Sequence, residues 1–344
     1  MKSLTPSLFL PLAATASILL ATGYALLLRR ALSRSETALL TLVLSVSLIV
    51  FSTLGLNLYG WTLFVLVPFL IGFISEVLYI RHNPEGSFKK GLLVATAALA
   101  LAGAGLILFA VEGAICLIMA FPLAFPLTLA GVAVGYSLHR RFWNRRPSPA
   151  LLLLLPLMAP LLMGAEAAAP RQPPVYRVRT AVEIDAPPEA VWRNVVSFRE
   201  LPPPDEWLFQ TGLAYPVRAE IRGTGVGAVR TCQFSTGPFV EPIEVWDEPR
   251  LLRFRVTANP PSLQELSPYG AIHPPHVQGF LVSKQGQFRL VRLPGGRTRL
   301  EGTTWYQHGL YPAGYWRLWS DWIIHRIHLR VLEHVKRLSE EKFS

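Results

Sequence analysis

The feature that most constrains the fold of this chain is a series of long apolar runs in its N-terminal half. A bilayer core about 30 Å thick needs about 20 apolar residues in one helix, because each helical residue advances about 1.5 Å. The runs cover residues 8–28, 37–56, 61–80, 91–111, 114–138 and 150–169, the last being the least apolar at its end. We therefore predict a multi-domain chain whose residues 1–169 form an all-α, polytopic membrane half with about six transmembrane helices.

The charges between these runs indicate how the helices cross the membrane. Basic residues gather after the first, third and fifth runs, and the positive-inside rule places such loops in the cytoplasm. These residues are Arg29, Arg30, Arg34, Arg81, Lys89, Lys90, Arg140, Arg141, Arg145 and Arg146. We predict an integral protein of a bacterial plasma membrane. Its C-terminal domain lies on the non-cytoplasmic side if the run 150–169 crosses fully.

The run 150–169 allows a second interpretation. Its short apolar core follows a basic segment and ends in the small residues Ala165, Ala167 and Ala169. Small residues at alternate positions are typical of signal-peptidase sites, so cleavage that releases the C-terminal domain is an open alternative.

The basic character of the chain does not indicate a nucleic-acid partner. The net charge is +11 and the pI is near 10, but the chain is 51% hydrophobic and only 16% charged. The basic residues sit in short loops between apolar runs or alternate with acids, and no arginine-rich run or stacking-aromatic motif is present. We expect membrane lipids, and no nucleic acid, as partners.

Two carboxylates, Glu76 and Glu112, stand out in the apolar half. Acids inside a membrane are costly and often mark proton or ion paths. Both lie near the ends of predicted spans, where a carboxylate reaches interfacial water. We favour this second interpretation.

The second half of the chain has the pattern of an α+β domain. Pro170, Pro173 and Pro174 form a short linker at 170–174, and alternating apolar residues begin at Val175. Several further strand-like segments follow, and the chain ends in one long amphipathic helix at about 313–341. This order predicts a helix-grip architecture over residues 175–344, in which a curved antiparallel sheet wraps a long C-terminal helix and leaves a cavity between them.

Three phrases in this half resemble a known group. They are Val182-Glu-Ile-Asp-Ala-Pro-Pro-Glu-Ala-Val-Trp192, Gly223-Thr-Gly-Val-Gly-Ala-Val-Arg230 and Arg297-Thr-Arg-Leu-Glu-Gly-Thr-Thr-Trp305. They are similar to the START-like, or SRPBCC, superfamily of polyketide cyclase/dehydrase and lipid-transport proteins. The resemblance covers about residues 175–342 and none of the membrane half. It implies a cavity for a hydrophobic ligand, and it carries no catalytic motif that applies to every member.

A hairpin around Ser235–Pro238 brings an acid and a base together. If its turn is tight, Cys232 faces Glu241, and Arg230 lies diagonal to that acid on a face that also carries phenylalanines. Such a pair is typical of the few polar groups that orient a ligand in an apolar pocket. An exposed surface ion pair is an equally good interpretation.

A second hairpin is expected to turn at Gly295–Gly296. A two-residue loop there places Glu301 and Trp305 near Phe288 and Leu290. The candidate ligand-binding residues are therefore Arg230, Glu241, Phe288, Glu301 and Trp305. No catalytic residue is identified.

The metal-ligating residue types do not form a predicted metal site. The two cysteines, Cys116 and Cys232, have no CxxC spacing and exclude a disulfide framework. Asp321, His325 and His328 share one helical stripe, but that stripe lies about a third of a turn from the apolar one, so we expect it to face solvent. We predict no metal and no cofactor.

These observations favour a binding protein over an enzyme. We expect a membrane-anchored START-like domain that binds a lipid or another hydrophobic small molecule next to the bilayer, in lipid transfer or sensing. One alternative is a cyclase- or hydrolase-like enzyme that uses Glu241 or Glu301 as an acid or base. Another is a protein-interaction cap on a membrane complex, which a solid core without a cavity would favour.

Overall fold

The computed structural model describes residues 11, 14–16, 18, 34–83, 85–142, 149–169, 172–265, 267–270, 272 and 274–341. The chain divides into two compact units. One consists of Met1–Arg171 with Leu266–Pro275, and the other of Gln172–Glu265 with His276–Ser344. The first will be called the helical unit and the second the C-terminal unit.

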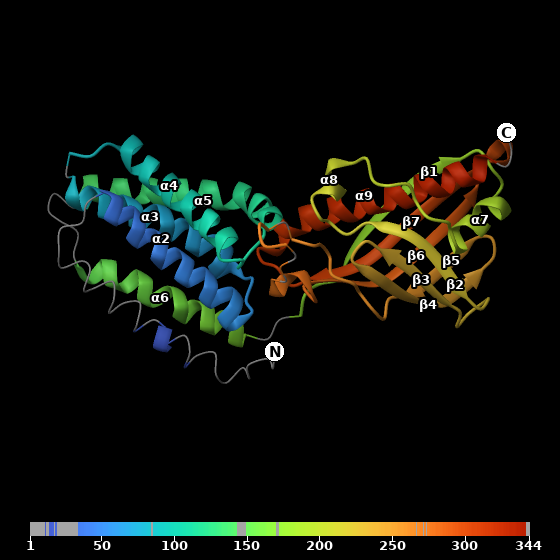
Figure 1. Ribbon diagram of the computed structural model, residues 1–344, viewed down its shortest axis with the longest axis horizontal. Coiled ribbons are helices and arrows are strands. Elements are labelled where there is room, and N and C mark those ends of the chain that lie inside the picture. The colour runs from blue at the N-terminus through green and yellow to red at the C-terminus, as the bar shows by residue number, and fades with distance from the viewer. Residues whose placement is uncertain are drawn as a thin grey trace. The chain divides into compact units, whose positions relative to one another are not determined.

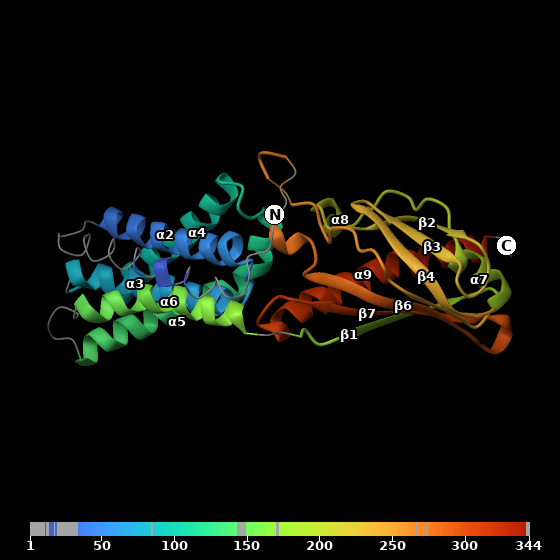
Figure 2. The same ribbon diagram turned by 90° about the horizontal axis from the view of Figure 1, so that it is seen from below.

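The helical unit contains a helix in each of the predicted runs that the structure describes. Figures 1 and 2 show these helices side by side in one bundle. They are α2 (Arg34–Val50) with the π-helical η2 (Phe51–Gly55), the π-helical η3 (Thr62–Leu66) with α3 (Val67–His82), α4 (Phe88–Leu108), α5 (Ala114–Phe142) and α6 (Pro149–Ala168). The predicted run 8–28 falls largely outside the described residues.

Three stretches of this bundle are long and apolar enough to cross a membrane. They are Thr62–Arg81, Phe88–Leu108 and Ala114–Arg141. A fourth apolar helix, Leu39–Gly55, is shorter. The prediction of about six spans is therefore not confirmed beyond these three candidate spans.

Glycines let α3 and α5 approach until their backbones touch. A Cβ atom added at Gly72 of α3 would lie 1.9 Å from the carbonyl oxygen of Thr128, and one added at Gly131 of α5 would lie 2.1 Å from that of Phe69. Gly131 and Gly135 are four residues apart, which is the GxxxG spacing of close helix pairs in membranes. Gly72 and Gly131 therefore leave no room for a side chain where α3 and α5 meet.

The C-terminal unit is built on one seven-stranded antiparallel sheet with the order β1-β7-β6-β5-β4-β3-β2. Figure 2 shows this sheet curving around the long helix α9, with β7 on one side and β4 on the other. The elements are β1 (Tyr176–Ile184), α7 (Pro188–Val196), α8 (Trp207–Gln210), β2 (Pro216–Arg222), β3 (Val229–Phe234), β4 (Gly237–Asp247), β5 (Leu251–Arg255), β6 (Leu281–Arg292), β7 (Thr298–His308) and α9 (Ala313–Glu340).

The core of this unit lies between the concave face of the sheet and α9. Alternate residues of β1 point inward, so Val182 and Ile184 are buried while their neighbours are exposed. Leu332 and Val335 of α9 are fully buried against the strands and belong to one apolar cluster with Leu300 of β7. The apolar stripe predicted for the last helix therefore packs on the sheet, and the helix-grip architecture of the C-terminal half is confirmed.

Candidate functional site

A cavity of about 140 Å³ lies beneath α9, and its lining comes from β3 to β7 and from α9 itself. Its apolar lining includes Phe234, Phe239, Phe254, Phe288, Ile323 and Ile327. A cavity of roughly 150 Å³ lined by apolar side chains stays dry and accommodates a benzene-sized molecule. The interior is therefore not packed solid, and its volume suits a small apolar group better than a whole lipid.

Arg230 and Glu241 form a buried ion pair at this cavity. The register of β3 and β4 sets the two residues directly opposite each other. The guanidinium Nη1 of Arg230 donates to Oε2 of Glu241, and the side chains are only 2% and 8% exposed. Nε of Arg230 also donates to the carbonyl oxygen of Val196, at 3.3 Å. The alternative of an exposed surface ion pair is therefore wrong.

Three aromatic rings surround the guanidinium of Arg230. The centroids of Phe198, Phe254 and Phe288 lie 5.5, 5.6 and 5.5 Å from its central carbon. The negative faces of aromatic rings attract a cation, and the attraction strengthens where water is excluded. The positive charge is thus balanced by one carboxylate and by three rings, of which Phe254 and Phe288 also line the cavity.

Burial controls the protonation of the groups next to this pair. It raises the pKa of the Cys232 thiol to about 12, although the neighbouring Arg230 acts in the opposite direction. Burial also raises the pKa of Glu241, against the lowering effect of Arg230. A nucleophilic cysteine needs a thiolate, so Cys232 is an inert part of the cavity wall at neutral pH.

The polar stripe of α9 faces the sheet, so the prediction that it faces solvent is wrong. Nδ1 of His325 lies 2.8 Å from the hydroxyl oxygen of Thr180 on β1. The hydroxyl of Tyr306 on β7 donates to Asp321 at 2.6 Å. Because the sheet curves around α9, strands contact two neighbouring stripes of the helix, and the polar one meets threonine and tyrosine hydroxyls.

His328 is the member of this stripe that lines the cavity. Its Nδ1 lies 3.1 Å from the hydroxyl oxygen of Thr180, and its Nε2 lies 2.8 Å from that of Thr304. Burial lowers the pKa of His328 to about 4, and the nearby His325 acts in the same direction. The ring is therefore neutral at pH 7. His328 therefore adds a polar group to the cavity, although the sequence pattern predicts that this residue faces solvent.

Glu301 and Trp305 lie on the other face of the sheet, which corrects their predicted place beside Phe288. Phe288 is opposite Gly302, whereas Glu301 is opposite Arg289. The connection contains three residues, Pro294–Gly296, instead of two. This difference moves the pairing by one position and turns each side chain of β7 to the opposite face.

On that outer face, Glu301 serves as a counterion for arginines. Its Oε1 is 2.9 Å from Nη2 of Arg179 and 3.2 Å from Nε of Arg299. Of the five predicted ligand-binding residues, Arg230, Glu241 and Phe288 therefore line the cavity, while Glu301 and Trp305 do not. Binding itself stays a prediction for the first three.

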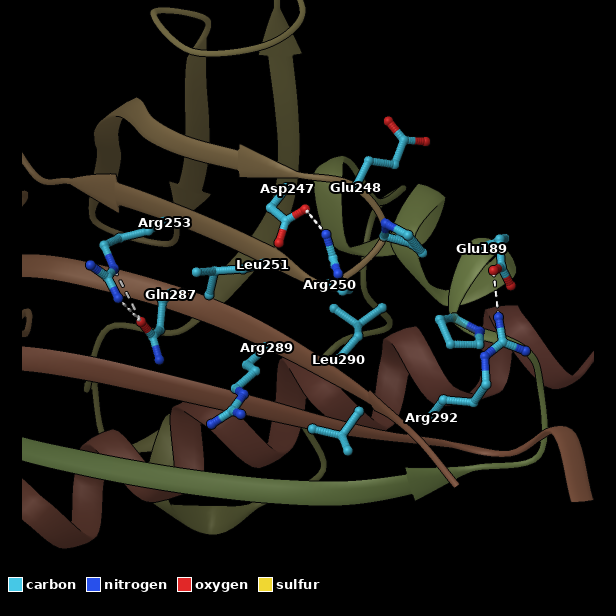
Figure 3. Close-up of a pocket in the computed structure, with 13 residues that line it drawn as sticks. Glu189, Asp247, Glu248, Arg250, Leu251, Arg253, Gln287, Arg289, Leu290 and Arg292 are labelled. Carbon is cyan, nitrogen blue, oxygen red and sulfur yellow. Dashed lines mark hydrogen bonds and ion pairs between the residues drawn. The ribbon is translucent and has the colours of Figure 1, made fainter. Parts of the chain in front are cut away.

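The outer face also carries an open groove of about 860 Å³ (Figure 3). Its charged side chains contact one another: Arg250 binds Asp247 at 2.9 Å, and Arg253 donates to the amide oxygen of Gln287 at 3.0 Å. The groove is larger than the cavity, but it is open to water and lined mainly by charged and polar groups. The cavity beneath α9 has the more apolar lining and is therefore the candidate site for a hydrophobic ligand.

The strand order and the enclosed long helix are those of the START-like helix-grip fold, which confirms the resemblance at the level of the fold. Solved structures of this kind match about half of the chain. A norcoclaurine synthase mutant of Thalictrum flavum is 12% identical, with a TM-score of 0.35, over 51% of this chain and 100% of its own. The Zhui aromatase/cyclase of Streptomyces sp. R1128 is 16% identical, with a TM-score of 0.34, over 50% of this chain and 97% of its own.

A protein of Thermus thermophilus is 17% identical, with a TM-score of 0.31, over 49% of this chain and 100% of its own. No protein-family model matches the chain, and no curated protein matches it. Identities and TM-scores this low carry no information about activity. The assignment of the fold rests on the strand order and on the helix packing described above.

Proposed function

We propose that the C-terminal unit binds a small hydrophobic molecule, or one apolar end of a lipid, in the cavity beneath α9. The observation that carries this proposal is the mainly apolar space of about 140 Å³ beneath α9, next to the buried pair of Arg230 and Glu241. Burial of apolar ligand surface supplies the affinity, at about 25 cal/mol per Å² removed from water. The few polar groups then select the orientation of the ligand.

Two kinds of polar group are available for that selection. The neutral ring of His328 and the hydroxyl of Thr304 line the cavity from α9 and β7. Arg230 and Glu241 satisfy each other, so together they present a dipole rather than a free charge. This arrangement favours a ligand with a hydroxyl or carbonyl group over one with a net charge, because an added charge would be desolvated without a new partner.

The same pairing supports binding over catalysis. The carboxylate of Glu241 is already bound to the guanidinium of Arg230, so accepting a proton from a substrate would break this buried ion pair, which disfavours Glu241 as a general base. Glu301 lies on the outer face and does not reach the cavity. A cyclase- or hydrolase-like role therefore has less support than a carrier or sensor role.

The helical unit supplies the second part of the proposal. We propose that its apolar helices anchor the chain in a bacterial plasma membrane and keep the C-terminal unit close to lipids, in transfer or sensing. Three helices with the length and composition of spans support this role. The placement of the C-terminal unit on the non-cytoplasmic side follows from the loop charges and stays a prediction.

The test uses the full-length protein and a long-chain alcohol with a photoreactive diazirine at its apolar end. After irradiation, mass spectrometry of peptides locates the crosslinks, which we expect on β4 to β7 and α9. Ile327→Trp adds bulk to the cavity wall and should lower the crosslinked fraction about tenfold or more, because the added ring fills the space of the ligand. The matched control is Ala181→Trp, which adds the same indole to an exposed position of β1 and should leave the crosslinks unchanged.

Equal labelling of the two variants, or crosslinks only outside the cavity, would contradict the proposal. Circular dichroism of both variants checks that the fold is retained. A crosslinked fraction that falls for Ile327→Trp but not for Ala181→Trp supports the proposal.

A further inference from the structure

Among the acids that the structure describes inside the helical bundle, Glu76 differs from the others in having no partner. Glu112 accepts a hydrogen bond from the hydroxyl of Tyr59 at 2.8 Å. Glu166 accepts from the backbone N–H groups of Trp61 and Thr62, at 2.7 and 2.9 Å. The side chain of Glu76 is 0% exposed, and neither of its oxygens has a hydrogen-bond partner among the described residues. It does not reach interfacial water, contrary to the expectation from the position of Glu76 in its run.

Two glycines make the space that this carboxyl group occupies. A Cβ atom added at Gly91 of α4 would lie 1.5 Å from Oε2 of Glu76. One added at Gly135 of α5 would lie 3.2 Å from its Cβ atom. The side chain of Glu76 therefore extends from α3 between α4 and α5, and its carboxyl group lies directly against the backbone of α4. A residue with any side chain at position 91 would displace it.

The basic groups of the neighbouring helices do not neutralise Glu76. Lys89 and Lys90 precede Gly91 on α4, and both are exposed. His139 lies one helical turn beyond Gly135 on α5, and its Nδ1 is buried without a hydrogen-bond partner among the described residues. An ionised carboxylate without a partner is very costly in apolar surroundings. A bound hydrogen ion removes that charge without any further ligand.

We propose that Glu76 is a proton-binding site of the helical unit, whose carboxyl group takes up and releases a proton within the space between α3, α4 and α5. The ligand is a proton rather than a metal ion because divalent cations require several oxygen ligands. The structure shows only one carboxyl group in this space among the residues it describes. Ser75 is the adjacent residue of the same helix, and neighbours in sequence do not face each other on a helix.

The test uses dicyclohexylcarbodiimide, a hydrophobic reagent, on the full-length protein in detergent. The O–H of a protonated carboxylic acid adds across one C=N bond of the reagent, and the resulting O-acylisourea rearranges to a stable N-acylurea. The carboxyl group thus gains one whole reagent molecule, and nothing leaves. Peptide mass spectrometry should find the labelled fraction at Glu76 far above that at Glu85, which is exposed. A water-soluble carbodiimide should give the reverse order.

Variants separate the site from its surroundings. Glu76→Gln keeps the shape of the neutral acid and should lose the label entirely. Gly91→Ala should reduce labelling at Glu76 several-fold, because the new methyl group occupies the space of the carboxyl group. Gly103→Ala is the control in the same helix, since its Cβ atom would come no nearer than 3.8 Å to another group. It should leave the labelling unchanged.

Infrared spectroscopy gives an independent measurement that needs no reagent to reach the site. The C=O band of a protonated carboxylic acid should be present in the wild-type protein and lost in Glu76→Gln. Absence of that band from the wild-type protein would overturn the proposal, whatever the labelling. Protection of Glu76 by sodium ions at constant pH would also overturn it, because a metal cation would then be the ligand.

Discussion

Arg230 and Glu241 face each other across β3 and β4 and form an ion pair that is almost completely removed from water. Taking two charges out of water costs several kcal/mol for each ion, and the attraction between them recovers this only where the geometry is good. Here the guanidinium also bonds to the carbonyl oxygen of Val196 and lies among three phenylalanine rings. Neither partner is therefore stable in this position without the other.

The first prediction follows from that dependence. Arg230→Met leaves the carboxylate of Glu241 buried and alone, so the C-terminal unit should lose about 3–5 kcal/mol of stability. The double variant Arg230→Met with Glu241→Leu should recover most of the loss, because two apolar side chains then fill the space. Thermal unfolding of the full-length protein, followed by tryptophan fluorescence, measures both.

The matched control is Arg250→Met. Arg250 pairs with Asp247, but the side chains are 74% and 44% exposed. Exposed pairs contribute less than about 1 kcal/mol, so this variant should unfold close to the wild-type temperature. Equal losses for Arg230→Met and Arg250→Met would show that the buried pair is not required for the stability of the fold.

The second prediction concerns pH and His328, whose pKa burial lowers from the ordinary 6.5 to about 4. The folded state therefore binds this proton less readily than the unfolded state. The contribution of His328 to stability is complete above pH 6.5 and is lost as the pH falls towards 4. Between pH 6.5 and 5 the loss should be about 2 kcal/mol.

Substituting His328 by glutamine removes the titrating ring. The decrease in unfolding temperature between pH 7 and pH 5 should then be smaller than in the wild-type protein. Thr304→Val removes the hydroxyl that contacts Nε2 but leaves the ring, so it should destabilise at every pH and keep the pH dependence. If His328→Gln has the same pH profile as the wild type, another group is responsible.

The third prediction concerns Cys232, whose pKa burial raises to about 12. Alkylation requires the thiolate, so iodoacetamide at pH 8 should modify native Cys232 about a thousand times more slowly than an ordinary cysteine with a pKa near 8.5. In a Cys116→Ser background, mass spectrometry gives the rate for Cys232 alone. The rate should rise to that of a free thiol in denaturant. Fast modification of the folded protein would mean that the cavity admits water.

The two hairpins explain which parts of the site could be predicted from the sequence. For the turn at Ser235–Pro238 the sequence predicts that Cys232 lies opposite Glu241. In the structure, Arg230 lies opposite Glu241. This error of two positions leaves every side chain on its predicted face, because the period of a strand is two. The acid, the base and the apolar wall can therefore be identified together, although the direct partner of Glu241 cannot.

For the turn at Gly295–Gly296 the error is a single position, and it removes Glu301 and Trp305 from the cavity. The two glycines both adopt left-handed backbone angles, as a tight turn requires, but Pro294 joins them in a three-residue loop. Loop length decides the register, and neighbouring glycines do not determine that length. Alternation of apolar residues cannot correct the error here, because both faces of β7 carry large side chains.

For the helices, the sequence predicts position along the chain but not which side of a helix faces its neighbours. Hydropathy predicts where the apolar helices lie, because a run of about 20 apolar residues has few other stable conformations. It contains no information on which side of a uniformly apolar helix faces its neighbours. The complete burial of Glu76 depends on the rotation of α3 and cannot be predicted from hydropathy. The contact of His325 and His328 with the sheet depends on the curvature of the sheet around α9, which the sequence pattern does not indicate.

The fourth prediction tests the close contact of α3 and α5. Gly131→Ala places a methyl group 2.1 Å from the carbonyl oxygen of Phe69, which belongs to the backbone and cannot rotate away. The helices must separate, and overpacking of this kind costs about 1–3 kcal/mol. The unfolding temperature of the helical unit, measured by circular dichroism of the full-length protein in detergent, should fall. Gly103→Ala on α4 is the control, because its Cβ atom meets only ordinary contacts and alanine is the better helix former by about 1 kcal/mol. An unfolding temperature that is the same for both variants would mean that α3 and α5 do not pack through their glycines.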